Sequence, residues 1–307
     1  MELKLLKTSF NSLFSERTVV SMENKKPNKT ITPYIMFVFF TIGFLIMIYP
    51  LISRTYYDYR GNEAIDDFQE ELADMPTVDL QEKLQLAYAY NNALLSGDER
   101  PLGDPFSEEE KEAGVSDYVH LLEMNEKIGV LTIPRINTKF PVYAGISEKV
   151  LQKGVGHLGG SSLPIGGLNT HSVLTAHRGL PENKLFTDLD KMQLDDLFFI
   201  ETIAGQLAYK VIEIQVIEPT AIEELSIQKN RDLITLLTCT PYMINSHRLI
   251  VLGERTKLPI KEQEKLTEIS WWNHLMSLLS GYIWILLVLL VILLFIGRKI
   301  WKKIRGE

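Results

Sequence analysis

The chain has 307 residues, of which 46% are hydrophobic and 23% are charged, and its net charge is −7 at pH 7. This length and composition suit one folded domain together with apolar membrane segments. The acidic balance does not fit a nucleic-acid-binding protein, because contacts to phosphates need a basic surface.

Two uncharged apolar runs, at residues 33–52 and 275–296, are each long enough to cross a membrane as a helix. Lysines precede the first run and basic residues follow the second, so the positive-inside rule places both ends in the cytoplasm. A cleaved signal peptide is the alternative for the first run, although no A-x-A-like site follows it. We therefore expect a cytoplasmic tail at 1–32 and a transmembrane helix or signal anchor at 33–52. Towards the C-terminus we expect a linker at 259–274, a transmembrane helix at 275–296 and a basic cytoplasmic tail at 297–307.

Residues 53–125 are then extracellular, and their pattern predicts two helices followed by a loop. Apolar residues recur at helical spacing at Ile65, Phe68 and Leu72, Met75-Pro76 interrupts the pattern, and a second helix starts near Asp79. Residues 97–116 contain two prolines and three glycines among many charges, which predicts a loop with a short helix at 107–114.

From residue 126 to 258 short strand patterns alternate with Gly/Pro-rich turns, which is typical of a mostly antiparallel barrel or sandwich. Strands are expected at 128–134, 139–145, 171–177, 196–202, 207–219, 232–239 and 247–255. Short helices are expected at 147–154 and 183–192. The predicted fold class is therefore mostly β, with short helices and an N-terminal helical pair.

Cys239, the single cysteine of the chain, ends the buried strand 232–239, where Thr240-Pro241 stops the ladder. Arg248 follows nine residues later and opens the next strand. If these strands are neighbours, the thiol and the guanidinium share one groove. A buried structural cysteine is the alternative. A single cysteine in an exported domain cannot form an internal disulfide, which favours a reactive thiol.

A histidine that ends a strand and enters a Gly-Pro loop, His177, is placed like a site residue. His157 and His171, both in loops, are the competing candidates, and by alternation His247 should face away from Arg248. No H-x-E, C-x-x-C or H-E-x-x-H spacing occurs, so we expect neither a metal nor a cofactor.

A thiol, an imidazole and a guanidinium together suit acyl transfer. The thiolate is the nucleophile, the imidazole protonates the leaving amine, and the guanidinium stabilises the oxyanion. The pattern contains no recognisable carboxylate or amide that would orient the histidine.

These residues resemble a known family. TLLTC, ending at Cys239, with Arg248 nine residues on, is similar to the sortase signature TLxTC…R, and residues 170–181, THSVLTAHRGLP, to the sortase histidine segment. Residues 154–179 resemble class C, the pilus-assembling sortases of Gram-positive bacteria. The resemblance covers about residues 54–297. It implies an eight-stranded sortase β-barrel with Cys239 as nucleophile, His177 as acid/base and Arg248 as stabiliser of substrate and oxyanion.

Asp104, Pro105 and Phe106 resemble the lid motif of class C. The resemblance implies that Asp104 pairs with Arg248 and that Phe106 covers Cys239. A C-terminal membrane helix is also typical of class C. Asp195-Asp196 departs from the family's Gly-Asp pair, which puts only the geometry of that turn in doubt.

The resemblance implies a membrane-bound cysteine transpeptidase whose catalytic domain is extracellular. Such an enzyme cleaves an LPxTG-like signal between Thr and Gly through a thioacyl intermediate and joins pilin subunits by a lysine isopeptide bond. Its partners would be pilins with this signal and an acceptor lysine, together with membrane lipid, and no nucleic acid. The alternatives are a housekeeping sortase that anchors proteins to the cell wall, a cysteine protease, and a non-catalytic scaffold for pilus assembly.

Overall fold

The structure is a computed structural model that describes residues 31–95, 102–107, 126–259 and 288. The chain divides into two compact units, Met1–Ile48 and Tyr49–Glu307. The described part of the first unit is the beginning of helix α2 (Ile31–Asp74), which continues into the second unit. All further description concerns the second unit.

Among the described residues, no helix is long and apolar enough to cross a membrane. The prediction of a transmembrane helix at 33–52 is therefore unsupported; these residues form part of α2. The apolar run at 275–296 lies outside the described residues apart from Val288. The expected short helix at 107–114, the tails and the linker lie outside them as well, apart from residues 31, 32, 107 and 259.

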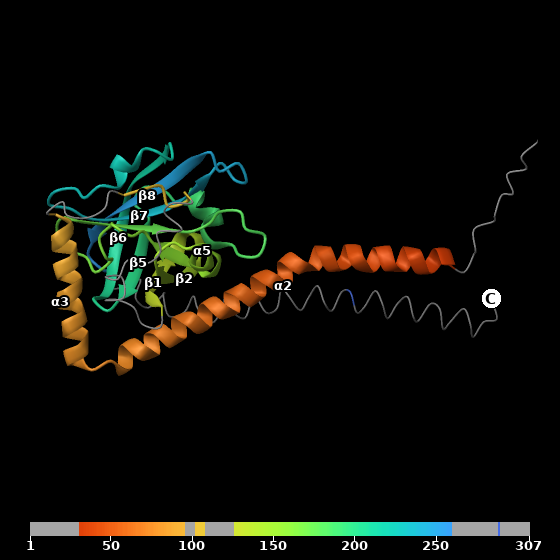
Figure 1. Cartoon of the computed structure of the whole chain (residues 1–307), viewed down its shortest axis with the longest axis horizontal. Coiled ribbons are helices and arrows are strands. Elements are labelled where there is room, and N and C mark those ends of the chain that lie inside the picture. The colour runs from red at the N-terminus through yellow and green to blue at the C-terminus, as the bar shows by residue number, and fades with distance from the viewer. Residues whose placement is uncertain (1–30, 96–101, 108–125, 260–287, 289–307) are drawn as a thin grey trace, which may run out of the picture. The chain divides into compact units, whose positions relative to one another are not determined.

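Within the described residues, eight strands close into a barrel in the order β1-β2-β3-β4-β7-β8-β6-β5 (Figure 1). The strands are β1 (Lys127–Ile133), β2 (Thr138–Ala144), β3 (Val155–His157), β4 (Thr170–Thr175), β5 (Leu197–Thr202), β6 (Gly205–Ile217), β7 (Asp232–Thr240) and β8 (His247–Thr256). The predicted mostly-β fold and its eight-stranded barrel are confirmed.

Two pairings in this barrel, β2 with β3 and β4 with β7, are parallel, and the others are antiparallel. The seven expected strands all form, and β3 is the strand that the pattern does not predict. Its three residues include Gly156 and are too few to show an alternation.

Short helices connect the strands. The predicted helices at 147–154 and 183–192 appear as α5 (Glu148–Lys153) and the 3₁₀ helix η3 (Leu185–Lys191). Two further 3₁₀ turns, η2 (Pro134–Ile136) and η4 (Ile222–Leu225), are not predicted.

The predicted N-terminal helical pair is present. Helix α2 ends at Asp74 and α3 (Thr77–Leu94) begins after Pro76, as the pattern indicates, and α2 starts at Ile31, so that it also contains the run at 33–52. Ile65 and Phe68 of α2 join the core of the barrel. Asn91 of α3 exchanges two hydrogen bonds with the backbone of Leu163: its Nδ2 donates to the carbonyl at 3.1 Å, and its Oδ1 accepts from the amide at 2.7 Å.

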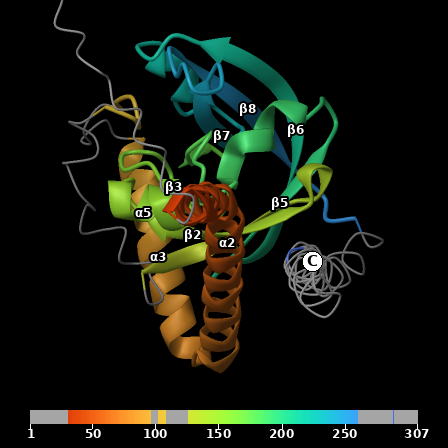
Figure 2. The same ribbon diagram turned by 90° about the vertical axis from the view of Figure 1, so that its right-hand side faces the viewer.

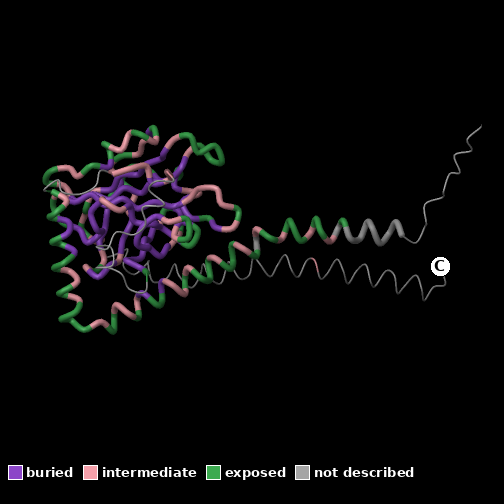
Figure 3. The backbone as a smooth tube through the Cα atoms, viewed as in Figure 1, coloured by how far each residue is buried: buried purple, intermediate pink, exposed green. Residues whose placement is uncertain are grey.

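Figure 2 shows both helices beside the strands, and Figure 3 shows that buried residues concentrate in the barrel while much of α2 and α3 is exposed. The barrel is therefore the rigid support for any site at the ends of its strands.

Candidate active site

Cys239 and Arg248 lie directly opposite each other on neighbouring strands. The antiparallel pairing of β7 with β8 makes them cross-strand partners. Residues paired in this way have Cβ atoms about 4.5–5.5 Å apart and side chains on the same face of the sheet. Both residues are buried. The two strands therefore bring the thiol and the guanidinium together, as the sequence predicts for neighbouring strands.

Strand β4 brings His177 to the same end of the barrel. Its parallel pairing with β7 sets Thr175 beside Leu237, and two residues further along these segments come His177 and Cys239. The same register continues beyond the end of β4 through two hydrogen bonds. The amide of Ala176 donates to the Leu237 carbonyl at 3.3 Å, and Thr238 Oγ1 donates to the Ala176 carbonyl at 2.7 Å. The three candidate residues therefore stand on three neighbouring segments of one sheet.

Arg178, which follows His177, fastens this segment, and the sequence analysis assigns it no role. Its guanidinium donates to Thr240 Oγ1 at 3.0 Å and to the Thr187 carbonyl at 3.3 Å, and it lies 2.7 Å from Asp190 Oδ2. Arg178 thus ties the residue after the histidine to the residue after the cysteine. Its only sequence signal is its place beside His177.

The predicted lid segment, residues 102–107, lies against Arg248 and His177. Asp104 accepts two hydrogen bonds from Arg248, at 2.7 Å from Nε and at 2.6 Å from a terminal nitrogen. The Phe106 ring lies 5.1 Å from the guanidinium carbon and 5.7 Å from the imidazole of His177, measured between ring centroids in the second case. Phe106 therefore contacts the guanidinium of Arg248 and the imidazole of His177, whereas the family resemblance implies a position over the thiol of Cys239.

Apolar contacts and a turn hold the lid segment in place. Leu102 and Phe106 pack against a buried cluster that includes Ile217 of β6 and Ile250 of β8. Pro105 is buried within a turn in which the amide of Ser107 donates to the Asp104 carbonyl at 2.9 Å. The turn directs the Asp104 carboxylate to the guanidinium while the flanking side chains bury apolar area.

The guanidinium of Arg248 remains charged in this setting. Burial disfavours the charge, but the hydrogen bonds to Asp104 and the negative charges at Cys239 and Asp104 outweigh it and raise the pKa of Arg248. Its other terminal nitrogen donates to the carbonyls of Asn245 and His247 at 3.0 and 3.1 Å. A fixed cation beside the sulfur favours the thiolate form of Cys239.

The competing histidines lie in the interior. His157 and His171 are fully buried. His157 Nε2 bonds to the Ser162 carbonyl at 2.9 Å, and His171 Nδ1 bonds to the Ser226 carbonyl at 2.9 Å. Burial lowers the pKa of both, that of His157 to about 4. Neither ring is accessible to a substrate.

His247 is paired elsewhere, with its Nε2 lying 3.1 Å from Glu218 Oε1. Its backbone stands opposite Thr240, one position away from the Cys239–Arg248 pair, so its side chain points to the other face of the sheet. His247 therefore faces away from Arg248, as the alternation of side chains along a strand predicts. Among the histidines of the described residues, His177 is the one that the fold brings beside Cys239.

A carboxylate that the sequence analysis misses lies beside His177. Glu148 Oε1, from the first turn of α5, is 3.2 Å from His177 Nε2. The two residues are 29 positions apart, and no spacing rule links them. The described residues contain no group of three or more His, Cys, Asp or Glu side chains that could hold a metal ion.

Comparison with known proteins identifies the family. The model of the sortase domain matches residues 131–256. Among curated relatives, Sortase D of Bacillus subtilis (strain 168) is 26% identical over 136 residues, which cover 43% of this chain and 66% of that protein. Sortase A of Bacillus anthracis is 25% identical over 133 residues, which cover 43% and 61%. The matched part thus spans just under two thirds of either curated relative.

Solved structures match more of the chain. Sortase C1 of GBS Pilus Island 1 is 48% identical, with a TM-score of 0.60 and coverage of 65% of this chain and 94% of that one. Sortase C-1 from Streptococcus pneumoniae is 47% identical, with a TM-score of 0.61 and coverage of 64% and 100%. A lid mutant of Streptococcus agalactiae Sortase C1 is 47% identical, with a TM-score of 0.58 and coverage of 64% and 99%. The chain therefore belongs to the sortase family, and the three solved structures named above are sortase C enzymes.

Proposed function

We propose that this protein is a cysteine transpeptidase of the class C type, which polymerises pilin subunits. The observation that carries the proposal is the cross-strand pair of Cys239 and Arg248, with His177 on the adjoining segment. A nucleophile, an acid/base and an oxyanion donor are the groups that acyl transfer requires. The likeness to a sortase of a pilus island supports a pilin as substrate.

The reaction follows from these groups. The thiolate of Cys239 attacks the carbonyl carbon of the threonine in an LPxTG-like signal, and Arg248 binds the resulting oxyanion. His177 gives its proton to the glycine nitrogen, so the Thr–Gly bond breaks and a thioester remains on Cys239. His177 then accepts a proton from the lysine amine of a second subunit. This amine attacks the thioester, releases the thiolate and forms the isopeptide bond.

The lid must leave before a substrate binds. Asp104 occupies Nε and one terminal nitrogen of Arg248, which are the N–H groups that a substrate carbonyl would use. Phe106 covers the same guanidinium and the imidazole. The described conformation is therefore the closed one, and binding of the signal shifts the population toward an open one.

Membrane attachment is part of the proposal on sequence grounds. The uncharged run at 275–296, followed by basic residues, fits an anchor that leaves the barrel outside the cell. Membrane lipid is then a partner of the anchor and takes no part in the chemistry.

The test is mass spectrometry of Cys239 after incubation with an LPxTG peptide, with Cys239→Ala as the control. We expect an acyl adduct on the wild-type thiol, and a ladder of covalent multimers once a pilin with an acceptor lysine is added. Peptide cleavage without multimers would indicate a protease. Multimers formed by Cys239→Ala would indicate a scaffold, and attachment to cell-wall peptide alone would indicate a housekeeping sortase.

A further inference from the structure

The contact between Glu148 and His177 joins two segments that lie apart in the sequence. Glu148 is the first residue of α5, in the connection from β2 to β3, and His177 follows β4. Their side chains are 49% and 17% exposed, and 3.2 Å separates Oε1 from Nε2. The Phe106 ring also lies near this imidazole, with 5.7 Å between ring centroids. The aromatic ring and the carboxylate are therefore two contacts that restrict the orientation of His177.

Helix α5 is itself fastened to the segment that carries His177. The Gln152 carbonyl at its other end accepts a hydrogen bond from Asn183 Nδ2 at 3.2 Å, and the Gln152 side chain donates to Glu148 Oε1 at 3.2 Å. Leu151, between them, is fully buried. The helix thus contacts the chain after β4 at both of its ends, so the position of Glu148 is fixed by the fold.

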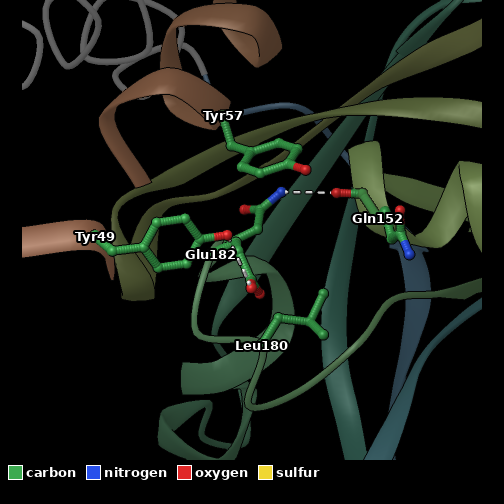
Figure 4. Close-up of a pocket in the computed structure, with 6 residues that line it drawn as sticks. Tyr49, Tyr57, Gln152, Leu180 and Glu182 are labelled. Atoms are coloured by element: carbon green, nitrogen blue, oxygen red, sulfur yellow. Dashed lines mark hydrogen bonds between the residues drawn. The ribbon is translucent and has the colours of Figure 1, made fainter. Parts of the chain in front are cut away.

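Figure 4 shows the hydrogen bond of this attachment as a dashed line that ends at the carbonyl of Gln152, with Leu180 and Glu182 nearby. A pocket of about 210 Å³ lies there, also lined by Tyr49 and Tyr57 of α2. Glu182 accepts a hydrogen bond from the Tyr49 hydroxyl at 3.4 Å. The carboxylate of this loop is therefore bonded to α2, whereas the carboxylate on α5, Glu148, contacts the imidazole of His177.

The contact determines which ring nitrogen carries hydrogen. An ionised carboxylate can only accept hydrogen bonds, so Nε2 of His177 must be the donor. In the neutral ring the lone pair then resides on Nδ1, the nitrogen able to take up a proton. When the ring is protonated, the carboxylate stabilises the positive charge.

From this geometry we infer that Glu148 is the positioning residue of His177, holding the Nε2–H tautomer and leaving Nδ1 to exchange protons with Cys239 and the amines. The assignment of the exchanging groups rests on the proposed function. The carboxylate takes the role of the orienting group that the sequence pattern does not reveal.

The elements around His177 carry further titratable and charged groups, namely Cys239 on β7, Arg248 on β8 with Asp104 on the segment 102–107, and Arg178 next in the chain. Arg248 and Arg178 are themselves bonded to Asp104 and Asp190. Glu148 is the carboxylate bonded to the ring, so its removal is the change that acts on the imidazole directly.

The test compares Glu148→Gln and Glu148→Ala in the full-length chain with a matched control, Glu218→Gln. Glu218 forms the same kind of contact, at 3.1 Å, with His247, which faces away from Cys239. Histidine-selective NMR follows the titration midpoint of His177 and the nitrogen that carries hydrogen. The rate of peptide transpeptidation at saturating substrate gives kcat.

For Glu148→Gln we expect a lower titration midpoint for His177 and a kcat reduced by about fivefold, the size of effect that a half-exposed ion pair gives. The amide oxygen of Gln can still accept a hydrogen bond, so the Nε2–H tautomer persists in that variant and becomes mixed in Glu148→Ala. Glu218→Gln should leave the midpoint of His177 and kcat unchanged.

A His177 midpoint and tautomer equal to the wild type in Glu148→Ala would overturn the inference, even if activity fell, because a purely structural role leaves both unchanged. The NMR measurements need no substrate. If the wild type formed no acyl adduct, the proposed function would fail, while the titration would still decide whether Glu148 orients His177.

Discussion

Asp104 and Arg248 form a two-point ion pair beside the candidate nucleophile, with both carboxylate oxygens bonded to guanidinium nitrogens at 2.7 and 2.6 Å. Their side chains are only 17% and 9% exposed, so solvent screens the pair weakly. In the proposed function these N–H groups bind the substrate carbonyl, so lid and substrate would compete for the same atoms. The strength of this pair would then set how often the thiol is open to solvent.

Replacement of Asp104 by Ala should make Cys239 react faster with a soluble thiol reagent. Loss of a charge-assisted pair of about 1.5–3 kcal/mol raises the open population by about tenfold or more. The measurement is the rate of alkylation of Cys239. Asp195→Ala is the control. Asp195 forms an ion pair with exposed Lys210, at 3.0 Å, and none of the lid contacts described above involves it. An alkylation rate equal to the wild type would contradict closure by this ion pair.

Arg248→Lys should abolish most transpeptidation although it preserves the charge. A lysine has one ammonium group and cannot bind Asp104 at two points while also donating to Asn245 and His247. Loss of a fixed oxyanion donor costs about a hundredfold in kcat. Arg255→Lys, on the same strand but over the ring of Tyr209, is the control. Full activity of Arg248→Lys would exclude the guanidinium as oxyanion donor.

Local sequence patterns are sufficient for the strands and for the placing of Cys239 and Arg248. An apolar run that ends at Thr-Pro predicts the end of β7, and the next run predicts β8. Their pairing follows from short connections between antiparallel strands. The structure also shows the contact of Asp104 with Arg248, which only the family resemblance predicts, because 144 positions separate the two residues.

Features that depend on distant pairings are not predictable from such patterns. The parallel contacts of β2 with β3 and of β4 with β7 involve no local signal. Glu148 reads as an ordinary first-turn acid of a short helix, and only the closed barrel places it beside His177. Helix α2 joins the run at 33–52 and the helix predicted around Ile65–Leu72 into one continuous helix, although Pro50 lies inside it.

Gly253→Ala should destabilise the barrel. A Cβ at this position would lie 2.4 Å from two ring carbons of Phe198 and 3.2 Å from Tyr209 Cβ. Phe198 is fully buried and stacked on Tyr209, with 5.6 Å between ring centroids, so it has little room to move. Overpacking of this kind costs about 1–3 kcal/mol, measured as a lower midpoint of thermal unfolding.

The control for this prediction is Gly61→Ala in α2. A Cβ there would meet only Pro141 Cδ at 3.9 Å, and alanine favours the helix by up to about 1 kcal/mol. The two substitutions are chemically identical and should have opposite effects on stability. A midpoint that rises or stays constant in Gly253→Ala would show that the Phe198–Tyr209 stack can adjust.

Stability should also depend on pH through the buried histidines. Burial lowers the pKa of His157 to about 4, although the hydrogen bond with the Ser162 carbonyl raises it. In the unfolded chain a histidine titrates near 6.5, so between about pH 6.5 and 4 the unfolded state binds a proton that the native state does not. The free energy of unfolding therefore falls as the pH falls through this window. His171 acts in the same direction.

We expect His157 alone to reduce the free energy of unfolding by about 2 kcal/mol between pH 7.5 and pH 5. This range lies above the region where carboxylates such as Glu254 take up protons, since the pKa of Glu254 is lowered by Arg231. Denaturant unfolding at several pH values measures the slope. In His157→Gln the slope should flatten even if overall stability drops. An unchanged slope in His157→Gln would contradict this prediction. It would mean that the native state of the wild type already holds a protonated ring at this position, although His157 is completely buried.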